Sequence, residues 1–198
     1  MGLKIRELEI KAKELDIPII QKEALEYIVE KLNQQSSSKI LEIGSAIGYS
    51  AILFVSNANN CKIETIEIDQ ERYDLAKYFI ELYDLKEKIT IHHADALSFN
   101  EDNLIIKEYD CLFIDAAKAQ YQKFFEKYIK YVKDDGYIIV DNLDFHGMIN
   151  HIESIKNRNT RQLVRKIKLF KEWIFNHKDY HCDYVMVGDG LAIIKRNK

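Results

Sequence analysis

The sequence predicts an α/β fold built on a mostly parallel sheet of seven strands, with helices on both faces. Apolar residues alternate along the chain between helix-like spacing and short runs rich in β-branched residues. Strands that alternate with helices are typical of parallel βαβ units with right-handed crossovers. The last two strand-like runs are joined by Gly188-Asp189-Gly190, which indicates a hairpin that adds an antiparallel edge strand.

The elements follow one another along a single domain, residues 1–198. Residues 1–38 form an N-terminal helical extension, which we expect to pack on the sheet or on a second subunit. The apolar spacing predicts helices at 3–15, 21–34, 50–58, 71–84, 120–132 and 160–176. The predicted strands are KILEI (39–43), KIETIEI (62–68), KITIHH (88–93), YDCLFID (109–115), GYIIVDN (136–142), DYVMV (183–187) and LAIIK (191–195).

The composition indicates a globular, cytoplasmic protein. Apolar residues make up 47% of the chain and charged residues 31%, an ordinary balance for a folded domain. The first residues lack the apolar core of a signal peptide, and no apolar run approaches the roughly 18 residues of a membrane span. The three cysteines, Cys61, Cys111 and Cys182, are scattered, which argues against a disulfide framework and favours a reducing compartment.

Charge is unevenly distributed along the chain. Residues 1–150 carry 18 basic and 27 acidic side chains, whereas residues 151–198 carry 11 basic and 5 acidic ones. The run KNRNTRQLVRKIKLFK (156–171) contains seven basic residues and no acid. Taken alone, such a run is more often a solvated helix face than a patch that attracts a polyanion.

The stretch ILEIGSAIGYS (40–50) places Gly44 and Gly48 directly after a predicted strand. Ligands of open α/β sheets bind beyond the carboxyl ends of the strands, where glycines let the backbone turn and approach a ligand. Ser50 lies where a helix begins, and the next strand contains Glu67, an acid that can accept hydrogen bonds from both ribose hydroxyls of an adenosine. This layout fits a nicotinamide dinucleotide or S-adenosylmethionine.

The details of the turn favour S-adenosylmethionine. A dinucleotide requires G-x-G-x-x-G around its pyrophosphate, whereas the spacing here is G-x-x-x-G. Glu42 would repel a pyrophosphate but suits a cationic sulfonium ligand that carries an ammonium group. Asp95 and Ala96 follow the third strand and could meet the adenine. A turn that serves only packing would explain Gly44. It would not explain why Glu42, Gly44, Gly48, Glu67 and Asp95 all lie at successive strand ends.

Oxygen-bearing side chains also follow the fourth and fifth strands. Asp115 ends the fourth strand with Lys118 three residues later, and Asp141 and Asn142 end the fifth. Adjacent parallel strands bring these ends together, and two carboxylates with an amide suit Mg²⁺ or a similar ion such as Mn²⁺ or Ca²⁺. Each residue alone could be a turn former or helix cap. Together they predict a metal site beside the cofactor.

A metal at this place indicates the chemistry. A divalent cation lowers the pKa of a hydroxyl and orients it for attack on a sulfonium methyl, and Lys118 could take the proton. The acceptor then needs two vicinal oxygens. A catechol has this arrangement, and so does 5-hydroxyuridine, so chelation does not separate the two.

The motifs LEIGSAIGYSAI, IEID, HADA, FIDAAK and VDN resemble those of the metal-dependent O-methyltransferases related to catechol and caffeoyl-CoA O-methyltransferases. The resemblance runs from about residue 17 to 191. It implies a Rossmann-like fold, metal ligation by Asp115, Asp141 and Asn142, and a catalytic role for Lys118. The cofactor contacts that it implies are Ile20, Ser50, Glu67, Asp95, Ala96 and Asp115. The family often has Met where this chain has Ile20.

Within that family, IPII (17–20), DFHG (144–147) and GDG (188–190) resemble the bacterial tRNA 5-hydroxyuridine methyltransferases. We therefore expect methylation of the wobble base at position 34, with Arg158, Arg161 and Arg165 as candidate phosphate contacts. The alternatives are a small catechol-like or caffeoyl-CoA-like acceptor and a non-catalytic S-adenosylmethionine- or RNA-binding protein. A nicotinamide dehydrogenase is a more remote one. A homodimer through the N-terminal helices is also expected.

Two further features can be explained by surface or core packing. His177 and His181 have a spacing that can bind a metal on a helix, but a surface or core role is favoured because a helix ends between them. Tyr121 could stack on the adenine or the acceptor, or pack in the core.

Overall fold

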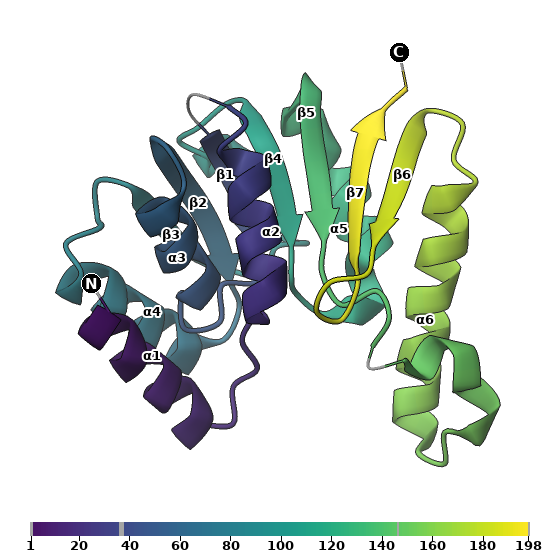
Figure 1. The fold of residues 1–198 in the computed structure, drawn as a ribbon. Helices are drawn as coiled ribbons and strands as arrows, with labels where there is room; N and C mark the ends of the chain where they lie inside the picture. The colour runs from purple at the N-terminus through teal and green to yellow at the C-terminus, as the bar shows by residue number, and fades with distance from the viewer. Residues whose placement is uncertain (1, 36–37, 146, 198) are drawn as a thin grey trace.

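The computed structural model describes residues 2–35, 38–145 and 147–197. Within these residues, seven strands form one sheet in the order β3-β2-β1-β4-β5-β7-β6 (Figure 1). The predicted fold class is confirmed. The strands are β1 (Ser38–Ile43), β2 (Cys61–Glu67), β3 (Ile89–His93), β4 (Tyr109–Ile114), β5 (Val132–Val140), β6 (Tyr180–Val185) and β7 (Leu191–Arg196).

The hairpin predicts an antiparallel strand at the edge of the sheet, but in the structure the antiparallel strand lies one position inside the edge. Strands β1 to β5 pair in parallel, and β7 inserts antiparallel between β5 and β6, so that β6 forms the edge. Burial explains this order. The segment 191–194 is entirely buried, whereas β6 is half-buried or exposed throughout. The more apolar strand of the hairpin therefore takes the inner position, where both of its faces are covered.

The helices have nearly the bounds that the apolar spacing predicted, with one exception. The predicted helix 120–132 ends four residues early, because a 3₁₀ turn (Ile129–Tyr131) leads directly into β5. A further 3₁₀ segment, η4 (Met148–Ser154), was not predicted. The helices are α1 (Gly2–Glu14), α2 (Lys22–Leu32), α3 (Tyr49–Asn57), α4 (Gln70–Leu82), α5 (Tyr121–Tyr128) and α6 (Arg158–Phe175), with 3₁₀ turns η1 (Glu101–Asn103) and η2 (Lys118–Gln120).

Two apolar layers enclose the sheet. Residues of α1, α2, α3 and α4 pack on one face, and residues of α5 and α6 pack on the other. Figure 1 shows α2 and α3 in front of the sheet and α5 behind it. Aromatic pairs join helices to the sheet, such as Phe54 of α3 against Phe113 of β4 with ring centroids 5.3 Å apart. The predicted helices on both faces are therefore present.

The N-terminal extension packs on the domain itself. Leu8 and Ala12 of α1 and Ile28 of α2 are buried in the first apolar layer. The Tyr49 hydroxyl donates a hydrogen bond to Glu9 Oε1 at 3.0 Å, which ties α1 to the start of α3. The homodimer expected through these helices stays a prediction. Among the described residues, no helix has the length and apolar character that crossing a membrane would require.

Candidate active site

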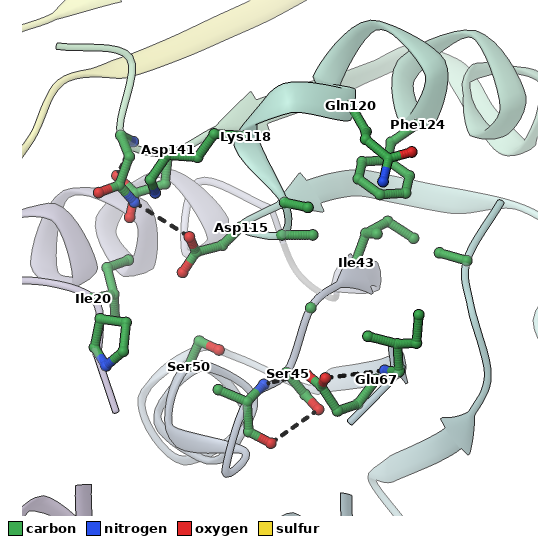
Figure 2. A pocket seen from close by; sticks show the side chains of 18 of the residues that line it. Ile20, Ile43, Ser45, Ser50, Glu67, Asp115, Lys118, Gln120, Phe124 and Asp141 are labelled. Atoms are coloured by element: carbon green, nitrogen blue, oxygen red, sulfur yellow. Dashed lines mark hydrogen bonds between the residues drawn. The ribbon is translucent and has the colours of Figure 1, made fainter. Parts of the chain in front are cut away.

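A pocket of about 820 Å³ opens at the carboxyl ends of the parallel strands. Its walls come from the turns after β1 to β5, the segment between α1 and α2, the β6–β7 hairpin and α6. Figure 2 shows Asp115, Lys118 and Asp141 together at one end of this pocket and Glu67 at the other. Ten of the eleven predicted site residues line it: Ile20, Gly44, Ser50, Glu67, Asp95, Ala96, Asp115, Lys118, Asp141 and Asn142.

The glycine turn after β1 lets two strand ends approach each other closely. Gly44 has φ +90°, and a Cβ built on it would lie 2.6 Å from the backbone oxygen of Asp115. Only glycine fits this conformation and this distance without strain. Gly48 precedes α3 in the left-handed conformation. The turn therefore brings the ends of β1 and β4 together at the pocket, where Gly44, Ser45 and Ala46 line it.

Glu67 is held in place by the backbone around it. Its carboxylate accepts hydrogen bonds from the N–H groups of Ala46, Ile68 and Asp69 at 2.8–3.0 Å. The side chain is only 5% exposed, yet it lines the pocket. A carboxylate has about four acceptor positions, so it can still accept bonds from a ligand. This geometry fits an acid that binds ribose hydroxyls.

Glu42 is the one predicted site residue that does not line the pocket. It is fully buried, and its Oε1 accepts a hydrogen bond from the Ser50 hydroxyl at 2.5 Å. Burial raises the pKa of Glu42 to about 7, although the bond from Ser50 acts in the opposite direction. Ser50 itself lines the pocket. Glu42 therefore lies behind the pocket wall and acts on the pocket through Ser50.

The residues predicted to bind a metal lie together at the ends of β4 and β5. Asn142 donates from Nδ2 to Asp115 Oδ1 at 3.2 Å and from its backbone N–H to Asp141 Oδ1 at 2.7 Å. Burial raises the pKa of Asp115, while Lys118 and Asn142 act against this shift. Burial and then the neighbouring Asp115 raise the pKa of Asp141 to about 7. Two carboxyls in this environment favour a bound cation.

The donor set fits a hard divalent ion with open positions. Among the described residues, no group of three His, Cys, Asp or Glu could hold a metal. The third protein donor would therefore be the amide of Asn142, and carboxylates with an amide are a set that Mg²⁺ and Ca²⁺ accept. Here the amide directs its nitrogen at Asp115, so it must turn to offer its oxygen.

Lys118 stands beside these acids. It begins η2 and lines the pocket, and its charge offsets part of the rise that burial causes in the pKa of Asp115 and Asp141. Its Nζ lies 5.8 Å from the centre of the Phe145 ring. A basic side chain therefore borders the same end of the pocket as the two carboxyls.

Helix α6 borders the pocket with an apolar side chain rather than with its basic ones. Leu163 lines the pocket. Because successive helical residues are about 100° apart, Arg158, Arg161 and Arg165 lie together on the side of α6 opposite to Leu163. Arg165 lies 3.8 Å from Glu153, and no ion pair of Arg158 or Arg161 is found among the described residues.

Several residues of the site had not been predicted as such. Nothing in the sequence distinguishes Phe124 from the core face of its helix, and Asp189 was interpreted only as part of the hairpin turn. Other pocket-lining residues that had not been predicted include Arg72, Gln120, Phe145 and Leu163.

The structure also shows the positions of Tyr121 and of the two histidines with metal-binding spacing. Tyr121 does not line the pocket. It is 1% exposed, packs edge-on against Phe170, and donates from its hydroxyl to the backbone oxygen of Asp141 at 2.8 Å. His177 and His181 contact Asp179 and Asp183, respectively, and belong to no metal-binding cluster of the described residues. His146 of the DFHG motif lies outside the described residues.

Known proteins identify the family of this chain. The profile of the O-methyltransferase family matches residues 4–197. The chain belongs to the O-methyltransferase family. This membership confirms the predicted enzyme class, that of the S-adenosylmethionine-dependent O-methyltransferases. Metal dependence, which the resemblance also implies, stays a prediction.

Individual members of the family resemble the chain over most of its length. A Staphylococcus aureus protein of known structure, provisionally named a caffeoyl-CoA O-methyltransferase, is 35% identical with a TM-score of 0.91; the match covers 98% of this chain and 92% of that one. A caffeoyl-CoA O-methyltransferase of Stellaria longipes is 29% identical over 164 residues, which are 80% of this chain and 68% of the relative. An O-methyltransferase from Bacillus cereus, solved with S-adenosylhomocysteine, shares the fold at 21% identity and a TM-score of 0.82.

Proposed function

We propose that this O-methyltransferase transfers the methyl group of S-adenosylmethionine to a hydroxyl chelated by a divalent metal. The observation that carries the proposal is the division of the pocket (Figure 2). An acid suited to ribose hydroxyls, Glu67, lies at one end, and Asp115, Asp141 and Lys118 lie at the other. A sulfonium between the two ends would bring its methyl group next to the acids and the lysine.

Each residue of the site has a separate role in the proposed reaction. Glu67, Asp95 and Ala96 would hold the adenosine, and Ser50 the methionine part. When bound by Asp115, Asp141 and Asn142, a divalent cation would lower the pKa of the acceptor hydroxyl and fix its two vicinal oxygens. Lys118 would accept the hydroxyl proton. The acceptor oxygen then forms a bond to the methyl carbon as the bond from carbon to sulfur breaks, and neutral S-adenosylhomocysteine leaves.

We infer that the acceptor is 5-hydroxyuridine at position 34 of tRNA, which the reaction converts to 5-methoxyuridine. The support is the basic face of α6, formed by Arg158, Arg161 and Arg165, which is the outer face of a helix whose opposite side lines the pocket through Leu163. A base inserted into the pocket leaves the rest of the anticodon arm outside, where its phosphates can contact this outer face. An unpaired wobble base also avoids most of the energetic cost of base opening. Such an acceptor would place the enzyme in the cytoplasm.

Nucleoside analysis tests the acceptor directly. The purified enzyme, S-adenosylmethionine and Mg²⁺ are incubated with tRNA from a strain that lacks the corresponding gene, and nucleosides are separated by mass spectrometry. We expect 5-methoxyuridine to appear as 5-hydroxyuridine declines. If 5-hydroxyuridine stays unchanged while the enzyme methylates a catechol in a parallel reaction, the tRNA proposal is refuted.

A small catechol-like or caffeoyl-CoA-like acceptor is the second candidate. The names of the relatives from Stellaria longipes and Staphylococcus aureus favour it. Caffeoyl-CoA carries phosphates of its own, so the basic face of α6 does not separate the two acceptors. Comparing kcat/KM for tRNA, caffeoyl-CoA and a simple catechol in one assay does.

The variant Asp141→Ala separates catalysis from binding. We expect it to lose methyl transfer while it keeps its affinity for S-adenosylhomocysteine, because Asp141 lies at the end of the pocket away from Glu67 (Figure 2). Turnover that persists in this variant refutes the metal site. A wild-type enzyme that binds the cofactor but methylates no acceptor instead supports the non-catalytic alternative.

A further inference from the structure

One face of α5 contacts the backbone at both ends of the pocket. Tyr121 and Tyr128 lie seven residues apart, about two helical turns, and therefore on the same side of the helix. Both side chains are buried, at 1% and 0% exposure. Each hydroxyl donates to a backbone oxygen of a pocket-lining residue, Tyr121 to Asp141 at 2.8 Å and Tyr128 to Ala96 at 2.6 Å. These two carbonyls belong to the predicted metal end and the predicted adenine end.

At the metal end, Tyr121 contacts a tight turn. Asn142 has φ +64°, a left-handed conformation that asparagine adopts more readily than most non-glycine residues. Both polar groups of the peptide that joins Asp141 to Asn142 are hydrogen-bonded: Asn142 N–H donates to Asp141 Oδ1 at 2.7 Å, and the Asp141 carbonyl accepts from the Tyr121 hydroxyl. Without that hydroxyl, the carbonyl loses its buried partner and the peptide can rotate. Rotation would move the side chains of both Asp141 and Asn142.

At the adenine end, α5 supports a wall that has no helix of its own. The segment after β3 has Ala96 at the pocket surface. Tyr128 binds the Ala96 carbonyl, and Lys127 Nζ donates to the carbonyls of Leu97 and Phe99 at 2.8 and 2.7 Å. Neighbouring residues of α5 therefore supply three of the hydrogen bonds that hold this wall.

We propose that Tyr121 and Tyr128 are positioning residues that act separately, Tyr121 on the metal ligands and Tyr128 on the adenine wall. Neither touches substrate or cofactor. The Tyr121 part rests on the metal site of the proposed function, whereas the Tyr128 part requires only the cofactor pocket. A hydroxyl that served stability alone would affect both ends of the pocket equally or not at all.

The test compares three Tyr→Phe variants, each of which loses one buried hydroxyl. The dissociation constant for Mn²⁺ is measured by electron paramagnetic resonance without cofactor, and that for S-adenosylhomocysteine by calorimetry without metal. The matched control is Tyr137→Phe, because the buried Tyr137 hydroxyl has no hydrogen-bond partner among the described residues. It should leave both constants unchanged.

Each of the two test variants should weaken the binding of a different ligand. Loss of a group that orients metal ligands commonly costs tenfold or more, so Tyr121→Phe should weaken Mn²⁺ binding about tenfold and leave S-adenosylhomocysteine binding nearly unchanged. Tyr128→Phe should weaken S-adenosylhomocysteine binding about three- to tenfold, the effect of one lost hydrogen bond, and leave Mn²⁺ binding unchanged. Equal effects of each variant on both ligands, or no effect on either, would overturn the proposal.

A fourth variant and the Mn²⁺ affinity of the wild-type enzyme test the two parts of the proposal separately. Lys127→Met removes the bonds to Leu97 and Phe99 from a partly exposed position, and should weaken only S-adenosylhomocysteine binding even if Tyr128→Phe fails to fold. If the wild-type enzyme binds no Mn²⁺, the metal site of the proposed function fails and the Tyr121 part falls with it. If the wild type binds Mn²⁺ and Tyr121→Phe binds it equally well, only the inference about Tyr121 is overturned.

Discussion

Glu64 is a fully buried carboxylate whose hydrogen bonds hold an irregular crossover in place. The chain passes from β3 to β4 without an α-helix among the described residues, so its N–H groups need other partners. Glu64 accepts bonds from Ile105 N–H at 2.9 Å and Ile106 N–H at 3.0 Å, and from the Tyr109 hydroxyl at 2.7 Å. His92 Nε2 lies 2.7 Å from its Oε1. One side chain thus replaces hydrogen bonds that a helix would make.

Replacing this carboxylate should destabilise the fold. Glu64→Gln removes a charge and adds amide N–H groups that face several donors, so we expect the free energy of unfolding to fall by about 2–4 kcal/mol at pH 7. Urea titration measures this. Glu81→Gln, at an exposed ion pair with Lys86, is the control and should change little. Equal stability of the wild type and Glu64→Gln would contradict the role of Glu64.

The pH dependence of the same variant has a defined sign. Burial alone would raise the pKa of Glu64, but the contact with His92 and the bonds from Ile106, Tyr109 and Ile105 outweigh it, and the pKa is lowered. A lowered folded-state pKa contributes stability above the unfolded value, and this contribution is lost as the pH falls through the folded value. The stability difference between the wild type and Glu64→Gln should therefore shrink on acidification below about pH 4.3.

A single added carbon at Gly44 tests whether the ends of β1 and β4 approach each other closely. In Gly44→Ala the new Cβ would meet the Asp115 backbone oxygen at 2.6 Å, with φ at +90°. The strands would have to separate, so we expect a loss of about 3 kcal/mol or more in unfolding free energy and weaker cofactor binding. Gly147→Ala is the control, because Gly147 has φ +74°, but among the described residues no atom beyond its chain neighbours lies within 4 Å of the added Cβ. This variant should cost only about 1–2 kcal/mol. Similar losses in the two variants would argue against a close approach at Gly44.

Gly44 and Glu64 show which residue roles can be predicted from the sequence and which cannot. Gly44 was found because its role depends on local context, a glycine turn directly after an apolar strand. Glu64 was missed because Ile105 and Tyr109 lie more than 40 positions away along the chain. Glu42 was correctly placed at a strand end, but which face of β1 carries it decides whether it meets the ligand or Ser50.

At the scale of elements, periodicity predicted the strands and most helices, and tertiary packing decided the rest. The segment 120–132 has the apolar spacing of one helix, yet Val132 pairs with Tyr109 of β4, so the helix ends early and a strand begins. The hairpin was recognised from its glycines. Its position in the sheet was not, because that depends on which of its two strands finds cover on both faces.

The basic face of α6 gives a prediction that belongs to a whole element. Reversing two charges in Arg158→Glu with Arg161→Glu should weaken tRNA binding about tenfold or more and reduce the slope of log K against log salt by roughly 1 to 2. Filter binding over a salt series measures both. Methylation of a simple catechol should persist, because neither arginine lines the pocket. Lys62→Glu with Lys77→Glu, at exposed positions of β2 and α4, makes the same change in net charge and is the control. An equal effect of this control would contradict a specific role for α6.

The whole molecule combines two half-sites at one point of the sheet. Strands β1, β2 and β3 lead into Gly44, Glu67 and Asp95, while β4 and β5 lead into Asp115 and Asp141. The strand order changes direction between β1 and β4, with helices on opposite faces on either side. Ligands of open α/β sheets bind at such a switch point. The chain order of motifs therefore predicted a shared pocket, although not its walls from α6 and the hairpin.

Because the proposed metal joins the ends of β4 and β5, its binding should be visible in the stability of the whole domain. A ligand at about 100 times its dissociation constant adds about 2.7 kcal/mol. In a domain of this size that should raise Tm by about 5–10 °C when Mn²⁺ or Mg²⁺ is added to enzyme treated with a chelator. Asp141→Asn keeps the side-chain volume but removes one ligand charge, so its Tm should not rise. Sodium chloride at equal ionic strength controls for screening, and an equal rise in the variant, or none in the wild type, would show that no cation binds between these strands.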